Sequence, residues 1–317
     1  MYTPPKYESR FFQFTRICII AVYLVIVAGA VVRMSGAGMG CPDWPTCFGK
    51  IIPPTDVSQL PENYQEIYAE RGYADTEFNA FHTWTEYVNR LVGAVAGLLT
   101  LILAIWSVKF LKKDPWVFFL SLATVLAMGF QGWLGAVVVY SVLQPFKITI
   151  HMLMALVIVF LLLHVYIRSY RGKLLPLWRD DAILKKLTLG LIVALLIQTV
   201  LGTQVREAID HIADTMGPDS RSVWIDNIGF VKVLHRSFAW IPFALGLAIL
   251  YRNAQKKYKM ASTWIIFGIL VLEIGSGILL YYTGMPAYAQ PIHLVLSTVL
   301  IGITYFLYLK LNRLGRN

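Results

Sequence analysis

The sequence has few charged residues, and this shortage excludes an ordinary soluble protein. Only 15% of the 317 residues are charged, whereas 57% are hydrophobic and the mean hydropathy is +0.61. Such a composition is typical of an integral membrane protein. The first apolar run also lacks a small-residue cleavage site and is too long for a removable signal peptide. We therefore expect this run to remain as a membrane helix.

Apolar runs long enough to cross a bilayer occur eight times, since a crossing takes about 20 residues. They lie at roughly 11–33, 84–108, 115–140, 147–168, 186–206, 230–251, 262–283 and 291–310. The sequence therefore predicts an all-α integral membrane protein with eight transmembrane helices.

Basic residues are scarce in one set of connections, and this asymmetry predicts the orientation. The loops at 43–77 and 207–226 are acidic or neutral overall, whereas the alternate connections and both ends of the chain are basic. We expect both termini to be cytoplasmic, in a multi-pass protein of the cell inner (plasma) membrane. The net charge of +10 needs no nucleic acid as partner, because most of the excess lies in loops that carry it beside the lipid surface.

Histidine is also rare, but three of the six histidines lie at matching places near the start of an apolar run. They are His151, His235 and His293, and the fourth matching place holds Asn89 instead. Neutral imidazole at membrane depth is costly unless it is paired, and haem iron is its commonest strong partner there. The pattern predicts a haem-binding bundle whose two halves differ.

Short motifs recur at an interval of four helices, which indicates an internal duplication. The paired motifs are Asn89-Arg90 with His235-Arg236, Ile150-His151 with Ile292-His293, Val32-Arg33 with Val205-Arg206, and QGWLG at 131–135 with EIGSG at 273–277. A shift of four helices preserves topology, so we predict two pseudo-symmetric parallel four-helix bundles. The halves are residues 1–170, which include a long outer loop at 34–83, and residues 171–317.

The two halves predict different iron chemistry. His235 and His293 can ligate one haem from both sides, which suits electron transfer; alternatively each merely bonds a neighbouring helix. His151 is paired with Asn89, and an amide is a poor iron ligand. A haem there would be five-coordinate or weakly six-coordinate, and therefore exchangeable. His82 precedes Asn89 by two helical turns and is expected to lie in the loop.

Each ionisable residue near these positions has two possible roles. Glu86 can relay protons or stabilise a cationic intermediate, or it is a helix-start acid that favours the dipole. Glu273 lies near mid-span and is either protonated and hydrogen-bonded or part of a proton path. Four arginines at the outer ends of helices can hold haem propionates or reach lipid phosphates. They are Arg33, Arg90, Arg206 and Arg236.

The first outer loop contains Cys41 and Cys47, and on the oxidising side of the membrane a disulfide is their expected state. The bond either staples the loop or takes part in thiol exchange beside the haem site. The polar and aromatic segment at 56–81 is expected to lie as a helix on the outer surface.

Taken together, SGAGMGCPDWPTC after the first helix, EYVNRL opening the second and the three matched histidines resemble the haem A synthase family. The resemblance covers nearly the whole chain. Members convert haem O to haem A by oxidising a ring methyl to a formyl, and the product serves the terminal cytochrome oxidase. Many members have His where this chain has Asn89, so the substrate haem is expected to be five-coordinate or to have a different sixth ligand here.

The resemblance implies a role for each candidate residue. Haem B is the cofactor between His235 and His293, with Arg206 and Arg236 beside it. The substrate haem O lies near His151. The residues expected around the substrate are Asn89, Arg90 and Arg33, and those expected to act on it are Glu86, Cys41 and Cys47.

The resemblance also implies partners, namely haem O synthase, the assembly of the terminal oxidase and the lipid membrane, and it leaves a homo-oligomer open. Two other functions compete with the enzyme. One is a membrane b-type cytochrome that carries electrons, and the other is a haem-handling or transport protein. Glu86 beside an incompletely ligated site, together with the cysteine loop, favours the enzyme, since a pure carrier gains by ligating both irons fully.

Overall fold

The structure, a computed structural model, describes residues 6–169, 181–217 and 224–312, and within them it is helical. Its long helices account for eight segments that are long and apolar enough to cross a membrane, as predicted. These helices are α1 (Lys6–Met34), α3 (Ala80–Ser107), α4 (Pro115–Tyr140), α5 (Pro145–Ser169), α6 (Ala182–Met216), α8 (Phe230–Phe238) with α9 (Trp240–Gln255), α10 (Ala261–Tyr282) and α11 (Ala289–Leu311).

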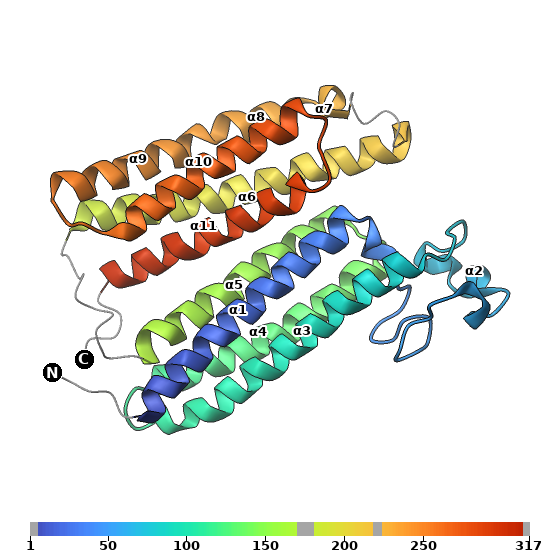
Figure 1. Cartoon of the computed structure of the whole chain (residues 1–317), viewed down its shortest axis with the longest axis horizontal. Helices are drawn as coiled ribbons and strands as arrows, with labels where there is room; N and C mark the ends of the chain where they lie inside the picture. Colours follow the sequence, from blue (N-terminus) through green and yellow to red (C-terminus); the bar gives the residue numbers. More distant parts are fainter. Residues whose placement is uncertain (1–5, 170–180, 218–223, 313–317) are drawn as a thin grey trace. The chain divides into compact units, whose positions relative to one another are not determined.

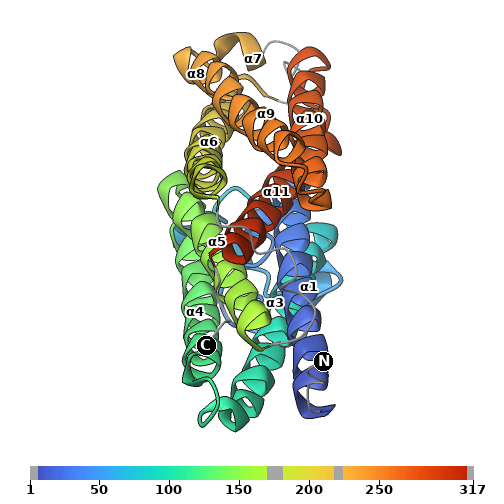
Figure 2. The same ribbon diagram turned by 90° about the vertical axis from the view of Figure 1, so that its left-hand side faces the viewer.

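The chain forms two compact units, one comprising Lys6–Tyr166 and the other beginning at Ile167. In the first unit α3 packs against both α1 and α4, and α5 runs alongside them (Figures 1 and 2). In the second unit α6 packs against α9 and α11, and α10 closes the ring between those two helices. The predicted boundary between residues 170 and 171 lies outside the described residues.

Polar residues at the first turns explain where several helices begin. The side chain of Asn79 accepts a hydrogen bond from the His82 amide at 3.1 Å, so α3 begins at Ala80. Asp114 caps α4 in the same way, with Pro115 at the first helical position. The expectation that His82 lies in the loop is therefore wrong, because the Asn79 cap draws the helix start upstream of it.

Asp181 caps α6 and also connects this helix to α9 and to the α9–α10 turn. It accepts hydrogen bonds from the Leu184 amide at 3.0 Å, from Arg252 Nε at 2.8 Å and from the Tyr258 hydroxyl at 3.0 Å. Burial acts to raise the pKa of Asp181, but these donors stabilise the charged form and lower its pKa to about 2. The carboxylate is therefore ionised at neutral pH.

The sixth membrane segment is one predicted helix but two observed ones. α8 ends at Phe238 and α9 begins at Trp240. Pro242 has no amide hydrogen, so it cannot donate to the carbonyl of Phe238, and the helix is interrupted there. The break lies about one turn after His235.

The outer loop of the first unit does not form the surface helix expected at 56–81. Residues 56–79 contain only short pieces, which are η2 (Val57–Gln59), α2 (Tyr64–Ile67) and η3 (Ala69–Arg71). The loop instead folds around the Phe48 ring, whose centre lies 5.4–6.2 Å from four other aromatic rings. Those rings belong to Tyr64, Tyr68, Tyr73 and Phe78. Aromatic packing in three dimensions replaced the helical periodicity that the sequence indicated.

Contacts with the α4–α5 turn fix this loop on the first unit. The hydroxyl of Tyr140 donates to the carbonyl of Trp44 at 2.8 Å, and the guanidinium of Arg71 lies 4.3 Å from the Tyr140 ring centre. Leu143 in the turn has a positive φ of 57° and packs so closely on Gly38 that a Cβ there would meet its side chain at 3.0 Å. The loop thus covers the end of the first unit from which α3 begins.

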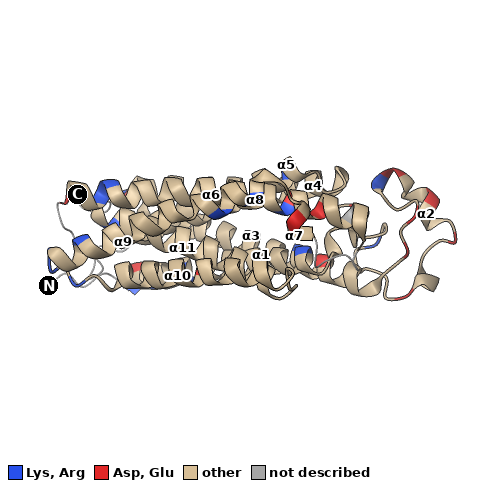
Figure 3. Ribbon diagram, turned by 90° about the horizontal axis from the view of Figure 1, so that it is seen from above, with Lys and Arg blue, Asp and Glu red and all other residues tan. Residues whose placement is uncertain are grey.

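Charge is sparse along the helices and gathers near their ends and in the loops (Figure 3). The outer loop carries exposed acidic side chains around α2. This distribution fits a membrane-spanning bundle, because charged groups are costly at membrane depth. The side of the membrane on which the termini lie stays a prediction.

Candidate functional site

In the second unit, His235 of α8 and His293 of α11 face one another. Their ring centres are 6.5 Å apart and the rings are inclined by 73°. Imidazole nitrogens bind metals at about 2 Å, so two rings on opposite sides of one metal have centres roughly 6 Å apart. The observed spacing therefore fits the predicted pair of axial haem ligands.

The neighbouring helix α10 orients His293 through one ring nitrogen. Nδ1 lies 2.8 Å from Ser276 Oγ and 3.5 Å from Glu273 Oε1, both on α10. A ligating imidazole commonly holds its second nitrogen in this way, which fixes the ring and leaves Nε2 for the metal. Sequence reasoning missed this role of Ser276. A signal existed, because both residues lie in the EIGSG motif that singled out this helix.

His235 is supported from α6. Gln198 Nε2 donates a 3.0 Å hydrogen bond to the main-chain carbonyl of His235, close to the break before α9. Gln198 Oε1 and His235 Nδ1 are both buried and without a hydrogen-bond partner. Gln198 was also missed, because a bond to a main-chain carbonyl leaves no pattern in the sequence.

The two arginines predicted for haem propionates in the second unit have partners of their own. Arg206 donates to the side chain of Gln290 and forms an ion pair with Asp210 at 2.7 Å, while its Nε is buried and unpaired. The Arg236 guanidinium lies 5.7 Å from the Tyr281 ring centre. Arg206 thus retains one free donor, and the propionate role of both residues stays a prediction.

A glycine lies beside each of the four matched positions. If these glycines carried a Cβ, it would lie 3.3–3.9 Å from the neighbouring candidate side chain. The pairs are Gly29 with Asn89, Gly135 with His151, Gly202 with His235, and Gly277 with His293. In both units the glycines come from the first and third membrane segments. This repeated relation supports the predicted duplication, although the symmetric placement of the two units stays a prediction.

In the first unit, His151 contacts a neutral partner. Gln131 Nε2 lies 3.3 Å from His151 Nε2 and donates to the His151 carbonyl at 3.1 Å. Gln131 occupies the place in QGWLG that Glu273 occupies in EIGSG. Among the residues that the structure describes, His151 Nδ1, Gln131 Oε1 and Asn89 Oδ1 are buried and have no hydrogen-bond partner. These polar atoms make the interior of the first unit suited to a polar or metal-containing ligand, because buried polar atoms are costly when unpaired.

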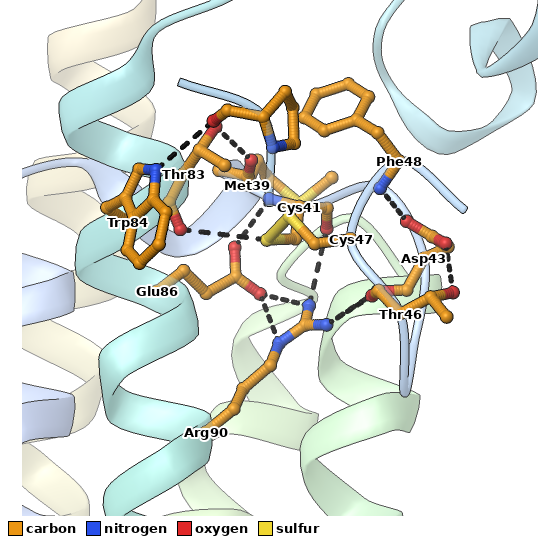
Figure 4. The surroundings of a disulfide bond; sticks show 12 residues. Met39, Cys41, Asp43, Thr46, Cys47, Phe48, Thr83, Trp84, Glu86 and Arg90 are labelled. Atoms are coloured by element: carbon orange, nitrogen blue, oxygen red, sulfur yellow. Dashed lines mark hydrogen bonds and ion pairs between the residues drawn. A yellow bond between two sulfur atoms is a disulfide. The ribbon is translucent and has the colours of Figure 1, made fainter. Parts of the chain in front are cut away.

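Glu86 lies one turn before Asn89 and is only 4% exposed. Its Oε2 accepts a 2.9 Å hydrogen bond from the Cys41 amide, and its Oε1 accepts bonds from Nε, at 3.1 Å, and Nη2 of Arg90 (Figure 4). Glu86 is therefore more than a helix-start acid, since it joins α3 to the outer loop.

In the structure Cys41 and Cys47 are joined by a disulfide. Thr83 of α3 donates to the carbonyl of Gly40 at 2.8 Å, and a Cβ at Gly40 would lie 2.3 Å from the His82 carbonyl oxygen. Only glycine therefore allows the loop to approach α3 this closely. The disulfide lies directly above Glu86 (Figure 4).

Other candidate residues lie apart from these clusters. His82 is half-buried in the first turn of α3, and His211 is exposed near the end of α6. Arg33 lies in the last turn of α1. The propionate role of Arg33 stays a prediction.

Known proteins that are similar to this chain over almost its whole length are haem A synthases. A haem A synthase of Shewanella oneidensis is 28% identical over 331 aligned positions, which cover 95% of this chain and 98% of the relative. The haem A synthase of Exiguobacterium sibiricum is 24% identical and covers 94% of this chain and 92% of its own length. That of Shouchella clausii is 36% identical over 118 positions, which cover 37% of this chain and 32% of the relative.

The sequence model of the COX15-CtaA family, described as cytochrome oxidase assembly protein, matches residues 13–305. This stretch begins within α1 and ends within α11, so it contains both units and every candidate site residue. The chain belongs to the COX15-CtaA family of cytochrome oxidase assembly proteins.

Proposed function

We propose that this membrane protein is an oxidoreductase that converts haem O to haem A, by oxidising a ring methyl to a formyl, for the assembly of cytochrome oxidase. The observation that carries the proposal is the contrast between two matched sites in a member of this family. One site presents facing imidazoles of His235 and His293, and the other presents His151 with unpaired amide oxygens. A fixed electron-transfer site and an exchangeable substrate site are what the reaction requires.

In the second half, residues 171–317, His235 and His293 would hold haem B as the resident cofactor. This haem would supply electron transfer. Gln198 and Ser276 keep the two imidazoles in place, and Gly202 and Gly277 leave space beside the rings. A cofactor held from both sides does not exchange readily, which suits a permanent electron carrier.

In the first half, residues 1–170, His151 would hold the substrate haem from one side. Asn89 lies at the other matched position, and its unpaired oxygen is too weak an iron ligand to retain the substrate firmly. Glu86 would stabilise positive charge that develops on the substrate or relay a proton, because it is a buried carboxylate at this end of α3. Arg33 is the candidate donor to the propionates, whereas the guanidinium of Arg90, the other expected donor, already donates to Glu86 and to three loop carbonyls.

The same proposal sets the cellular context. The protein would lie in the cell inner membrane with both termini cytoplasmic, and would receive haem O from haem O synthase, without a nucleic-acid partner. The acidic loop that carries α2 would then face the oxidising side, where the Cys41–Cys47 disulfide is stable.

A membrane b-type cytochrome that only carries electrons is the second candidate, and the His235–His293 pair alone would suit it. The first unit argues against this function. A carrier would ligate both irons fully, yet Asn89 replaces the fourth histidine and Gln131 replaces the counterpart of Glu273.

The decisive experiment is to express the chain together with a source of haem O, extract the haems and identify them by chromatography and mass. We expect haem A, or a hydroxylated precursor of it, only when the protein is present. A purified protein that contains haem B but never yields either product would favour the carrier.

Asn89→His tests whether the first unit holds substrate from one side only. The new imidazole supplies the missing ligand, so haem added to this unit should shift towards low spin and dissociate about tenfold more slowly, the equivalent of 1.4 kcal/mol. Turnover should not rise. Spectra and release rates should be compared with Asn63→His, which places the same residue in the exposed loop. An unchanged spin state in Asn89→His would place the substrate iron elsewhere.

A further inference from the structure

The Arg90 guanidinium makes more contacts than any propionate role explains. Nη1 donates to the carbonyls of Asp43 at 2.7 Å and Thr46 at 2.9 Å, and Nη2 lies 3.5 Å from the carbonyl of Cys41. The same group pairs with Glu86 Oε1 through Nε and Nη2. One side chain of α3 therefore gathers three carbonyls of the disulfide loop and one carboxylate (Figure 4).

The loop is shaped to present those carbonyls. The Asp43 carboxylate accepts hydrogen bonds from the amides of Phe48 at 2.6 Å and Gly49 at 2.8 Å, and also from the Thr46 hydroxyl. These bonds close residues 43–49 into a tight turn that contains Cys47. The disulfide joins this turn covalently to Cys41. The carbonyls that Arg90 binds are therefore held in place by both the disulfide and Asp43.

Glu86 depends on the same arrangement. Glu86 Oε1 accepts hydrogen bonds from Arg90, and Oε2 accepts one from the Cys41 amide. Cys41 is part of the loop, and Arg90 is the residue that binds it. A buried carboxylate without such donors is costly, and it would move or become neutral. Opening the loop would therefore change the position of Glu86 without touching Glu86 itself.

We propose that Arg90 is a positioning residue for the reaction, and that it joins the Cys41–Cys47 loop to the Glu86 carboxylate so that the disulfide acts by fixing this carboxylate. The inference rests on the proposed function for the identity of the reaction. It also chooses between the two readings of the cysteine pair, since the disulfide serves as a structural brace for Glu86 and takes no part in thiol exchange during turnover.

The test compares Arg90→Gln, Arg90→Lys and the pair Cys41→Ser/Cys47→Ser with the parent protein. In Arg90→Gln we expect the phosphine reductant TCEP to open the disulfide about tenfold faster, because several charge-assisted bonds to the loop are lost. Haem A formed per molecule of bound haem O should fall about 100-fold. Arg90→Lys should be intermediate on both measures, since one ammonium cannot serve the carboxylate and the carbonyls together. Arg16→Gln, an exposed residue of α1, is the matched control and should behave as the parent.

Combining the changes separates bracing from thiol chemistry. If the disulfide acts through Arg90 and Glu86, adding Arg90→Gln to the serine pair should cause little further loss of product per bound haem O. Independent losses that multiply in the combined variant would overturn the proposal. So would a serine pair that makes no product while Arg90→Gln remains near the parent, because that result requires thiol chemistry.

Failure of this inference can be told apart from failure of the proposed function. If the parent makes no haem A, the function is wrong, but the rate of disulfide opening still shows whether Arg90 holds the loop. An unchanged rate in both Arg90 variants overturns the positioning role whatever the reaction is. The low-spin spectrum of the second unit reports that each variant is folded, and Arg90→Lys keeps the comparison informative if Arg90→Gln does not fold.

Discussion

Replacing either His235 or His293 with Ala is expected to abolish the low-spin haem spectrum of the purified protein. The two rings face one another with their centres 6.5 Å apart, so in the proposed site both imidazoles would hold the iron, and loss of either would leave it incompletely ligated. Optical and electron paramagnetic resonance spectra of the purified variants, together with the haem content per chain, are the measurements. We expect haem content to fall at least tenfold in the double variant.

His211→Ala is the matched control for these variants, since it removes an exposed histidine from the same unit. Its spectrum and haem content should equal those of the parent. If both single variants at His235 and His293 keep the parental low-spin spectrum, the ligand assignment is wrong, and the two histidines only bond neighbouring helices.

Glu86→Gln is expected to lower haem A formation about 100-fold, which is the usual scale for loss of a positioned acid–base group. The variant keeps the size of the side chain but removes its charge. Its amide nitrogen must also face either Arg90 or the Cys41 amide, and both are donors, so one buried contact becomes unfavourable. The haem of the second unit should keep its spectrum, because Glu86 belongs to the other unit.

The measurement is the yield of haem A and of its hydroxylated precursor from haem O, beside Glu77→Gln, which changes an exposed glutamate of the outer loop in the same way. Accumulation of the precursor alone would place Glu86 at the second oxidation. A full yield of haem A from Glu86→Gln would remove this residue from the mechanism. If the protein is only an electron carrier, neither variant should differ from the parent, which would itself form no haem A.

The membrane helices were predictable because their signal is local. A run of about 20 apolar residues is needed to cross a bilayer, and this length can be read without knowing what the run contacts. The starts of α3 and α4 also follow from adjacent residues, Asn79 and Asp114, whose side chains bond the first turn. The start of α3 was nevertheless placed too late, since the hydrophobic run begins several residues after its cap.

The outer loop was predicted poorly for the opposite reason. Its polar and aromatic segment at 56–81 was expected to be a surface helix, but Phe48 packs against rings that are 16–30 positions away in the chain. Packing among distant residues has no fixed period in the sequence. The interruption between α8 and α9 was missed too, although Pro242 marks it, because the apolar run continues through the break.

The sequence by itself determined that this chain spans the membrane, that its cysteines can pair and that three histidines and Asn89 lie at equivalent places. Each of these features depends on the type and spacing of residues along the chain. Only the tertiary structure decided what holds those residues. Gln198 and Arg90 act by donating to main-chain carbonyls 37 to 49 positions away, and every residue type has such a carbonyl. Folding alone selects which carbonyl comes within reach, so the supports of the candidate site became visible only in three dimensions.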